Sequence, residues 1–531
     1  MRKKILLFLV ALTATMWSAA KAQSAGTVDT SWGTNGVVQT AIGSGNWVAD
    51  IVRKVATYSN GKIIAVGSSK VGKNSRVALA RYNADGSPDN TFGKSGSGQL
   101  LLIDETGDDS YFQIATDVKI LPDGKILVCG RMFDGSSSTV LLLKFNDNGS
   151  FDTSFGTKGV MKDYSDMGAE KMVVQSDGKI VVGGYHQDNF TAVRYNPDGS
   201  RDNSYGNQGM CKILIPNSIN TSYANSIDIQ ADGKIILGGF FSDSGIWKWG
   251  IARINVNGTI DTSFGDNGIQ KMSIGSGNDF TAVVKVLPNG KILIGGHSWD
   301  NNSKPPHIAL TYSIAFAQLN EDGSWDKSFA KEESGAIRKR LVDGCENYLT
   351  DMVVNQDGKI YGSVSIDNDL NNQQDIGIIS LTKEGKLNSA FGNNGIVVTD
   401  ILNKSTDISQ AIALQSDGKI IVGASIYTDK GTPFTLVKYH SDSNVGTDIQ
   451  EITSDIESVS VYPNPTKEIL NIAISERLNN YKVQIFDMSG SVVMTTTNTK
   501  TVNVSLLGRG NYIVKVISAD NKIFVSRFTK K

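Results

Sequence analysis

A repeat of about 60 residues fills most of this chain and restricts the folds that it can adopt. The first element of the repeat is an Asn/Asp-Gly-Lys turn followed by a short apolar run. The glycines of this turn are Gly61, Gly124, Gly178, Gly233, Gly290, Gly358 and Gly418. The second element is Asp-x-Ser/Thr-aromatic-Gly, with two degenerate copies. Its aromatic residues are Trp32, Phe92, Phe155, Tyr205, Phe264, Phe329 and Phe391. Self-similarity at a fixed period is typical of repeat architectures such as solenoids and propellers.

Each unit of the repeat contains four short apolar runs. In the unit around Asp177 they are residues 171–174, 180–182, 192–195 and 210–213. Runs of this length between Gly, Asn and Asp predict strands, and Asp-Gly or Asn-Gly pairs supply the positive φ angles of tight hairpin turns. Four antiparallel strands form one propeller blade. The fold class is therefore all-β.

The two ends of the array are incomplete in complementary ways. The chain begins with the motif of Asp29 to Gly33, without a preceding Gly-Lys turn, and the last unit ends at Tyr439 without an aromatic-Gly motif. If the N-terminal strand completes the last blade, residues 23–442 form a seven-bladed β-propeller of four-stranded blades with no exposed sheet edge. An open solenoid is the alternative, and it requires capping units that we do not see in the sequence.

The repeat resembles the delta-60 repeat family of bacterial secreted proteins. The resemblance rests on segments such as Gln175–Gly184 and Arg194–Ser200 and extends over nearly all of residues 25–440. It implies a β-propeller. The family carries no established catalytic residues, so none are transferred to this chain.

The N-terminus has the composition of an export signal. Arg2, Lys3 and Lys4 form a basic start, residues 5–13 are apolar, and residues 20–22 read Ala-Lys-Ala, a cleavage pattern. We predict a signal peptide at residues 1–22. We predict no transmembrane span in the mature chain, because no run reaches the roughly 20 apolar residues that a bilayer requires.

The C-terminal residues differ in composition from the repeats. A polar linker is predicted at 443–457, and residues 458–531 contain short alternating strands, which predict a small antiparallel β-sandwich. This segment resembles the type A C-terminal sorting domain of type IX (Por) secretion. The residues that carry the motif are Tyr462, Pro463, Asn464, Pro465, Gly490, Gly510 and Tyr512. The resemblance implies recognition by the type IX machinery and export through the periplasm to the cell surface or the extracellular space. A generic carbohydrate-binding or immunoglobulin-like sandwich is the alternative.

Composition and motifs argue against several functions. The 52 basic and 53 acidic residues nearly cancel, which argues against a nucleic-acid partner. The four histidines lack metal-ligand spacing, and neither a nucleophile elbow nor a P-loop is present, so we predict no catalytic residues, no metal and no cofactor. Turns such as residues 83–87 faintly resemble calcium loops. Asp and Asn exchange freely at that position of the repeat, which a turn tolerates better than a calcium site does.

Topology indicates where a ligand would bind. If the strands of a unit alternate in direction, the two conserved turns share one face, and the loops of variable length share the opposite face. The variable loops richest in aromatic residues are 241–250 and 297–312. The candidate ligand-binding residues there, together with one histidine in a third loop, are Trp247, Trp249, His297, Trp299 and His186. Trp beside Asn and Asp is typical of sugar-binding surfaces, and ordinary loop packing is the alternative.

We therefore predict an exported binding module whose ligand is a glycan or a surface protein. An enzyme acting on polysaccharide, a hydrolase or a lyase, is one alternative and requires two carboxylates that face each other. Asp104, Glu105, Asp108 and Asp109 are candidates in one variable loop. A structural surface component is the other alternative.

Overall fold

The computed structural model describes residues 24–442 and 460–531. Gaps within these ranges fall at 44–47, 103–111, 134, 217, 300–311, 334, 343–344, 369–372, 403–404, 430, 464, 474–479, 487–491 and 519–522. The predicted signal peptide and linker lie outside the described residues. The chain divides into two compact units, Met1–Val445 and Gly446–Lys531. Among the described residues the only helices are the short 3-10 turns η1 (Lys94–Gly96) and η2 (Lys331–Glu333), and none is long and apolar enough to cross a bilayer.

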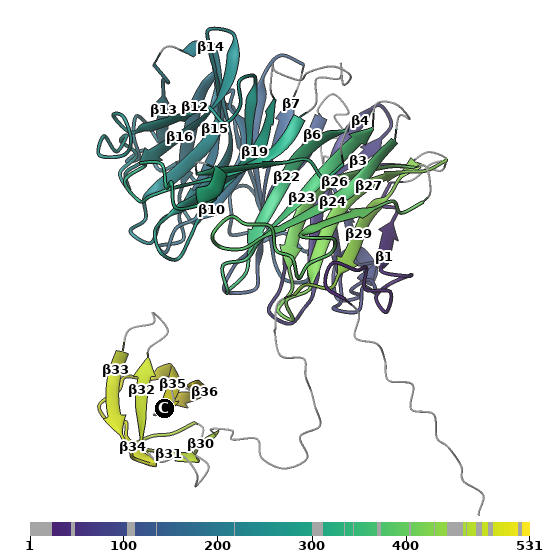
Figure 1. Cartoon of the computed structure of the whole chain (residues 1–531). Helices are drawn as coiled ribbons and strands as arrows, with labels where there is room; N and C mark the ends of the chain where they lie inside the picture. The colour runs from purple at the N-terminus through teal and green to yellow at the C-terminus, as the bar shows by residue number, and fades with distance from the viewer. Residues whose placement is uncertain are drawn as a thin grey trace, which may run out of the picture. The chain divides into compact units, whose positions relative to one another are not determined.

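The strands of the first unit form antiparallel groups of four, each running from a first to a fourth strand (Figure 1), and one parallel bridge between Gln374 and Thr406 joins the last two groups into one sheet. The first strands are β2 (Val48–Thr57), β6 (Phe112–Ile120), β10 (Gly168–Val174), β14 (Ser218–Ile229), β18 (Asp279–Val286), β22 (Glu346–Val354) and β26 (Thr406–Leu414). The second strands are β3 (Ile63–Val71), β7 (Ile126–Phe133), β11 (Ile180–His186), β15 (Ile235–Asp243), β19 (Ile292–Trp299), β23 (Ile360–Asn368) and β27 (Ile420–Tyr427).

The third and fourth strands complete each group, in the same order along the chain. The third strands are β4 (Asn74–Tyr82), β8 (Ser138–Phe145), β12 (Asn189–Tyr195), β16 (Ile246–Ile254), β20 (Tyr312–Leu319), β24 (Gln373–Leu381) and β29 (Phe434–Tyr439). The fourth strands are β5 (Gln99–Leu101), β9 (Val160–Asp163), β13 (Met210–Ile213), β17 (Ile269–Met272), β21 (Ala336–Lys339), β25 (Ile396–Thr399) and β1 (Val37–Thr40). A two-residue strand, β28 (Gly431–Thr432), pairs in parallel with β2.

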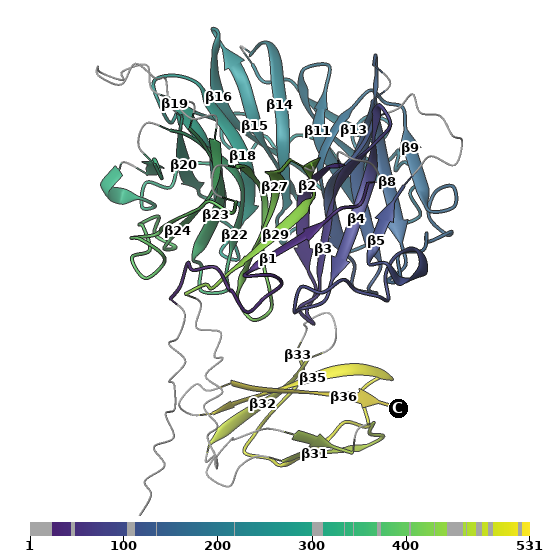
Figure 2. The same cartoon turned by 90° about the vertical axis from the view of Figure 1, so that its right-hand side faces the viewer.

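The N-terminal strand completes the last group, as the sequence predicts. β1 runs antiparallel to β29, with Val37 opposite Val437 and Thr40 opposite Phe434. Both strands, purple and light green, lie side by side in Figures 1 and 2. The pairing continues before β1, where the amide of Asp29 donates to the carbonyl of Lys438 at 2.8 Å.

Successive groups contact each other in a circuit that returns to its start. Each first strand packs against the next, from β2 through β6, β10, β14, β18 and β22 to β26, and β26 packs against β2. A second circuit joins the conserved turns of neighbouring groups by backbone hydrogen bonds. Its donor and acceptor pairs are Gly93–Asn148, Gly156–Asp198, Gly206–Asn257, Gly265–Asp322, Ala330–Glu384, Gly392–Ala25 and Gly33–Asp85. The N-terminal segment supplies both an acceptor and a donor.

The two repeated motifs bind each other, which explains why they occur together. The Asp of the second motif accepts hydrogen bonds from the Ser or Thr two residues later through Oδ1. Its Oδ2 pairs with the Lys of the Gly-Lys turn in the same group. These pairs are Lys62–Asp89, Lys125–Asp152, Lys179–Asp202, Lys234–Asp261, Lys291–Asp326 and Lys419–Asp29, at 2.6–3.2 Å. The two conserved turns therefore share one face, as predicted.

The aromatic residue of the second motif is a packing anchor. All seven of these rings are at most 3% exposed. Five lie beneath a cationic side chain of the same group, in the pairs Arg81–Phe92, Lys144–Phe155, Arg194–Tyr205, Arg253–Phe264 and Lys438–Trp32. A buried ring with a cation over its face stabilises the turn without exposing a surface to a ligand.

The second unit consists of two sheets around one buried cluster. One sheet has the order β30 (Ser460–Tyr462), β31 (Ile469–Ala473), β34 (Thr501–Asn503). The other has the order β33 (Val492–Thr497), β32 (Tyr481–Phe486), β35 (Gly510–Ser518), β36 (Ile523–Lys530). Leu470 and Val502 from the first sheet and Val483 and Val514 from the second belong to the same buried cluster.

Candidate binding site

The first strand of every group contains a β-bulge at the same position. The register shifts leave one extra residue in each strand, and these residues are Arg53, Thr116, Glu170, Asn225, Ala282, Thr350 and Gln410. A bulge re-aims a side chain, and here all seven bulge residues line one cavity of about 440 Å³. Because the first strands form the inner circuit, this cavity lies at the axis. We call it the axial cavity.

One side of the axial cavity is cationic. Arg53 is exposed, and no hydrogen bond or ion pair joins it to any described residue. Arg131 lies 2.5 Å from Glu170, and Lys171 Nζ donates to the carbonyl of Thr116 at 3.1 Å. The described lining thus holds three cations and one carboxylate.

The opposite side is aromatic. Phe240, Phe280 and His297 line the cavity, with ring centroids 5.0 Å apart for Phe240–Phe280 and 5.4 Å for Phe280–His297. Trp247 packs edge-on against Phe240, and Tyr348 packs edge-on against His297. Ring contacts continue to Tyr185, Tyr223 and Tyr312. These rings are half-buried and come from four adjacent groups of strands.

The first strands are also joined by charged residues next to the cavity. Lys54 Nζ lies 2.5 Å from Asp351 Oδ2, although the two strands belong to groups that are not neighbours. Asp117 Oδ2 accepts the amide of Met172 at 3.0 Å, and Asp228 Oδ2 accepts the amide of Val286 at 2.8 Å, each from the next group. Burial raises the pKa of Asp117, but the charges of the neighbouring lysines lower it to about 2. These carboxylates therefore connect the first strands of different groups.

The five predicted ligand-binding residues occupy different positions relative to the axial cavity. His297 lines the axial cavity, whereas Trp247 does not line it and packs edge-on against the lining residue Phe240. Burial lowers the pKa of His297 to about 4, so the ring is neutral at neutral pH. Trp249 is completely buried, so its ring offers no surface to a ligand. Trp299 packs on Gly277, and His186 ends β11. Neither residue lines the cavity.

The loop predicted at 241–250 is a tight hairpin. β15 and β16 extend to the turn at Ser244 and Gly245, which have φ angles of 54° and 86°. His297 and Trp299 likewise belong to β19. The apolar pattern continues through these segments, and pairing with the neighbouring strand keeps them extended. The candidate carboxylates at 104, 105, 108 and 109 lie outside the described residues.

The bulge residues are not among the predicted binding residues, although the sequence contains a signal for them. Each bulge residue stands eight positions before the glycine of its Gly-Lys turn, for example Arg53 before Gly61 and Glu170 before Gly178. Around this position the repeat is regular, yet the residue itself is Arg, Thr, Glu, Asn, Ala, Thr or Gln. Variation in charge at one fixed position of a regular scaffold is typical of a binding surface.

Acidic groups also occur in turns and clusters away from the cavity. Oxygens of Asp375, Asp400 and Asp407 lie within 4.8 Å of one another, but Asp407 already accepts the amide of Ile401 and the hydroxyl of Ser405. The turn residue Asp85 accepts both the amide and the hydroxyl of Ser87.

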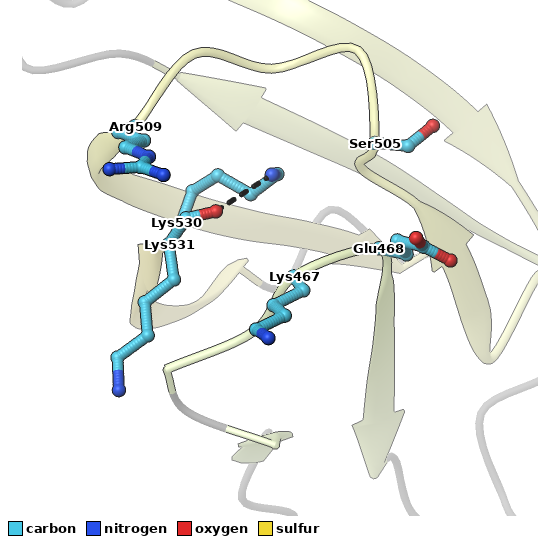
Figure 3. A pocket seen from close by; sticks show the side chains of 6 residues that line it. All are labelled: Lys467, Glu468, Ser505, Arg509, Lys530 and Lys531. Atoms are coloured by element: carbon cyan, nitrogen blue, oxygen red, sulfur yellow. Dashed lines mark hydrogen bonds between the residues drawn. The ribbon is translucent and has the colours of Figure 1, made fainter.

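The second unit has a basic pocket of its own. Lys467, Arg509, Lys530 and Lys531 surround it with Glu468 and Ser505, in a volume of about 700 Å³ (Figure 3). Lys530 Nζ donates to the carbonyl of Lys531 at 3.2 Å, and the amide of Lys531 donates to Thr466 at 2.9 Å.

The residues of the predicted sorting motif are spread over the same unit. Gly510 begins β35, and the hydroxyl of Tyr512 donates to the carbonyl of Gly508 at 2.9 Å. Tyr462 is 56% exposed and Pro463 and Pro465 are exposed. Asn464 and Gly490 lie outside the described residues.

Comparison with known families identifies both units. Residues 460–531 match the model of a secretion system C-terminal sorting domain. Residues 59–92, 121–155, 175–205, 230–264, 287–329 and 415–445 match a domain of unknown function, DUF5122, described as a β-propeller. The chain carries DUF5122 propeller repeats and a sorting domain. Such a sorting domain is recognised by the type IX secretion machinery, and it marks proteins exported to the cell surface or the extracellular space.

Solved structures resemble the chain only distantly. Apo prolyl oligopeptidase B from Galerina marginata matches with a TM-score of 0.40 and 12% identity, over 90% of this chain and 56% of that chain. Sqt1 from Chaetomium thermophilum matches with a TM-score of 0.40 and 10% identity, over 77% and 99%. The β-propeller domain of the Trilobed protease from Pyrococcus furiosus matches with a TM-score of 0.38 and 10% identity, over 75% and 94%. The chain therefore spans just over half of prolyl oligopeptidase B. Among curated proteins, none matches this chain.

Proposed function

We propose that residues 23–442 form a closed seven-bladed propeller that binds a glycan in the axial cavity after export of the chain. In this proposal residues 1–22 are a signal peptide, 443–457 a linker and 458–531 a small sandwich that the type IX machinery recognises. The circuits of first strands and of turn hydrogen bonds support closure, because both return to their start through the N-terminal segment.

The observation that carries the proposed binding function is the composition of the axial cavity. Its aromatic wall offers half-buried rings, and its bulge residues include the amide of Gln410 and the guanidinium of Arg53. A sugar presents an apolar ring face and a polar rim, so it uses both kinds of group. The described lining includes one carboxylate, Glu170, which is paired with Arg131. A glycosidase that works with two carboxylates needs a second one, so binding is the function that this site supports best.

A glycan array tests this function. We expect the purified chain to bind a restricted set of glycans without releasing reducing ends. Phe280→Leu removes a ring from the cavity wall but keeps an apolar side chain, and it should weaken the signal at least tenfold. Phe133→Leu is the matched control, because Phe133 ends β7, is 45% exposed and lies outside the cavity. Absence of binding to every glycan, or equal loss in both variants, would contradict the proposed function.

A further inference from the structure

The charge of the axial cavity differs from that of the chain as a whole. The chain has a net charge of −1, whereas the described cavity lining carries Arg53, Arg131 and Lys171 against the single carboxylate Glu170. Three cations minus one anion leave a net charge of +2. Walls of low dielectric concentrate such a field, so the cavity attracts anions.

Arg53 is the cation best placed to meet a ligand. Arg131 is engaged with Glu170 at 2.5 Å, and Lys171 donates to a backbone carbonyl, while Arg53 is exposed and makes no hydrogen bond or ion pair with the described residues. Its guanidinium presents donors in a planar fork, which matches the two oxygens of a carboxylate. The bulge directs this side chain into the cavity lining.

Two neutral residues of the lining each have one buried polar atom without a partner among the described residues. Asn225 donates through Nδ2 to the carbonyl of Thr281, but its Oδ1 is buried and accepts no hydrogen bond from the described residues. His297 Nδ1 is buried without a partner in the same sense. Buried polar atoms are normally satisfied in folded proteins, so these two atoms mark a polar region of the fold behind the cavity lining.

We propose that the axial cavity binds an acidic sugar, with the sugar carboxylate on Arg53 and the apolar face of the ring on the wall formed by Phe240 and Phe280. This inference rests on the proposed glycan-binding function and names its ligand class. The cavity volume of about 440 Å³ falls in the range of sites for small ligands, so it accommodates a short stretch of a uronate-containing glycan.

The test compares ligands that differ only in the carboxylate. Isothermal titration of the purified chain would use trisaccharides of galacturonate, glucuronate and mannuronate, their methyl esters and neutral galactose trisaccharide. We expect one or more of the acids to bind at least tenfold more tightly than its ester. Added KCl should weaken binding of the acid and leave binding of the ester unchanged, because salt screens the charge interaction.

Two variants assign the effect to Arg53. Arg53→Gln should reduce the preference for acid over ester to about twofold or less. Lys73→Gln is the matched control, because Lys73 is an exposed cation in the hairpin between β3 and β4 and lies outside the cavity. This variant should keep the full preference. Circular dichroism and thermal unfolding would establish that both variants fold.

The outcomes separate this inference from the proposed function. Equal affinity for acid and ester, or an acid preference that survives Arg53→Gln, would overturn the acidic-sugar inference and leave glycan binding intact. Triaspartate is titrated in the same way, and its binding without binding of any sugar would overturn both. Absence of binding to all the trisaccharides, together with a negative glycan array, would overturn the proposed function itself.

Discussion

Asp442 Oδ2 lies 2.7 Å from Lys359 Nζ. Lys359 belongs to the Gly-Lys turn between β22 and β23, whereas Asp442 follows β29 in the next group. In the other groups the Lys of the Gly-Lys turn pairs with the Asp of the same group's second motif. In the group of β22 to β25 that position is Asn388. Asp442 follows the last propeller strand and also accepts from Asn388 Nδ2 at 2.6 Å and from Tyr361. A carboxylate from the end of the propeller therefore replaces the one that the repeat lacks.

Because of this replacement, we expect the effects of substitutions at Asp442 and Asn388 on the free energy of unfolding to depend on each other. Asp442→Asn should lower the free energy of unfolding by about 1–3 kcal/mol, because Lys359 loses a charged hydrogen-bond partner. Asn388→Asp alone should also destabilise, since it places two carboxylates side by side. The double variant should recover most of the loss, because it restores the motif of the other groups. Urea unfolding of the four proteins would measure this, and additive losses in the double variant would contradict the account.

The paired aspartates predict sensitivity to acid. Burial alone would raise the pKa of Asp29, but hydrogen bonds from Lys419 and Ser31 and the Lys419 charge lower it to about 2. The pKa of Asp261 is also lowered to about 2. Because these values lie below the unfolded value of about 3.9, the stabilisation is complete above pH 4 and is lost as the pH falls toward 2.

Unfolding by urea between pH 5 and pH 2 measures this loss. Asp29→Asn should be less stable at pH 5 and should lose less stability on acidification. Asp429→Asn, which removes an exposed carboxylate, should follow the parent chain. Parallel pH profiles for Asp29→Asn and the parent would show that the Asp29 carboxylate does not cause the loss of stability at low pH.

A second pH window arises from His297. Burial lowers its pKa from 6.5 to about 4, so the folded state favours the neutral ring. Stability from this group is present above pH 6.5 and is lost as the pH falls through 4, by up to about 3 kcal/mol. His297→Phe should flatten the profile between pH 6.5 and 4, as measured by urea unfolding. A profile with unchanged slope would show that His297 is not buried as described.

The strands and their turns were predictable because each is encoded locally. The Asp-Gly-Lys turn and the apolar run after it specify the second strands, and the unmatched halves at the two ends predicted the pairing of β1 with β29. The first strands were harder to read. They carry Thr116, Lys171 and Asn225 in mid-strand, since the axis accommodates polar side chains, and bulges break their alternation.

The candidate site was predicted only in part. Trp247 and Trp249 look equivalent in the sequence, yet they lie two and four residues after the turn at Gly245 of one hairpin. Trp249 is deep enough to pack against Gly296 of the next group, while Trp247 stays half-buried against Phe240. Which residue is exposed depends on the position of the turn and on the neighbouring group, and neither is encoded in the local pattern.

The basic pocket of the sorting domain predicts a charge requirement for export. Replacing Arg509 and Lys531 together by Gln should reduce the amount of chain outside the cell several-fold, because both side chains border the pocket. Replacing the exposed Lys500 and Lys482 is the matched control, since these cations lie outside the pocket. Immunoblots of culture supernatant, cell surface and periplasm would measure the distribution. Equal export of both double variants would show that the pocket is not required for sorting.

Closure of the propeller by its N-terminal segment is the central claim, and a double-mutant cycle on Asp29 and Lys419 tests it most directly. These residues are 390 positions apart, and Lys419 Nζ lies 2.6 Å from Asp29 Oδ2. The free energies of unfolding of Asp29→Ala, Lys419→Ala and the double variant should reveal a coupling energy of about 1–3 kcal/mol. Effects that add to within about 0.5 kcal/mol would mean that the two ends do not meet.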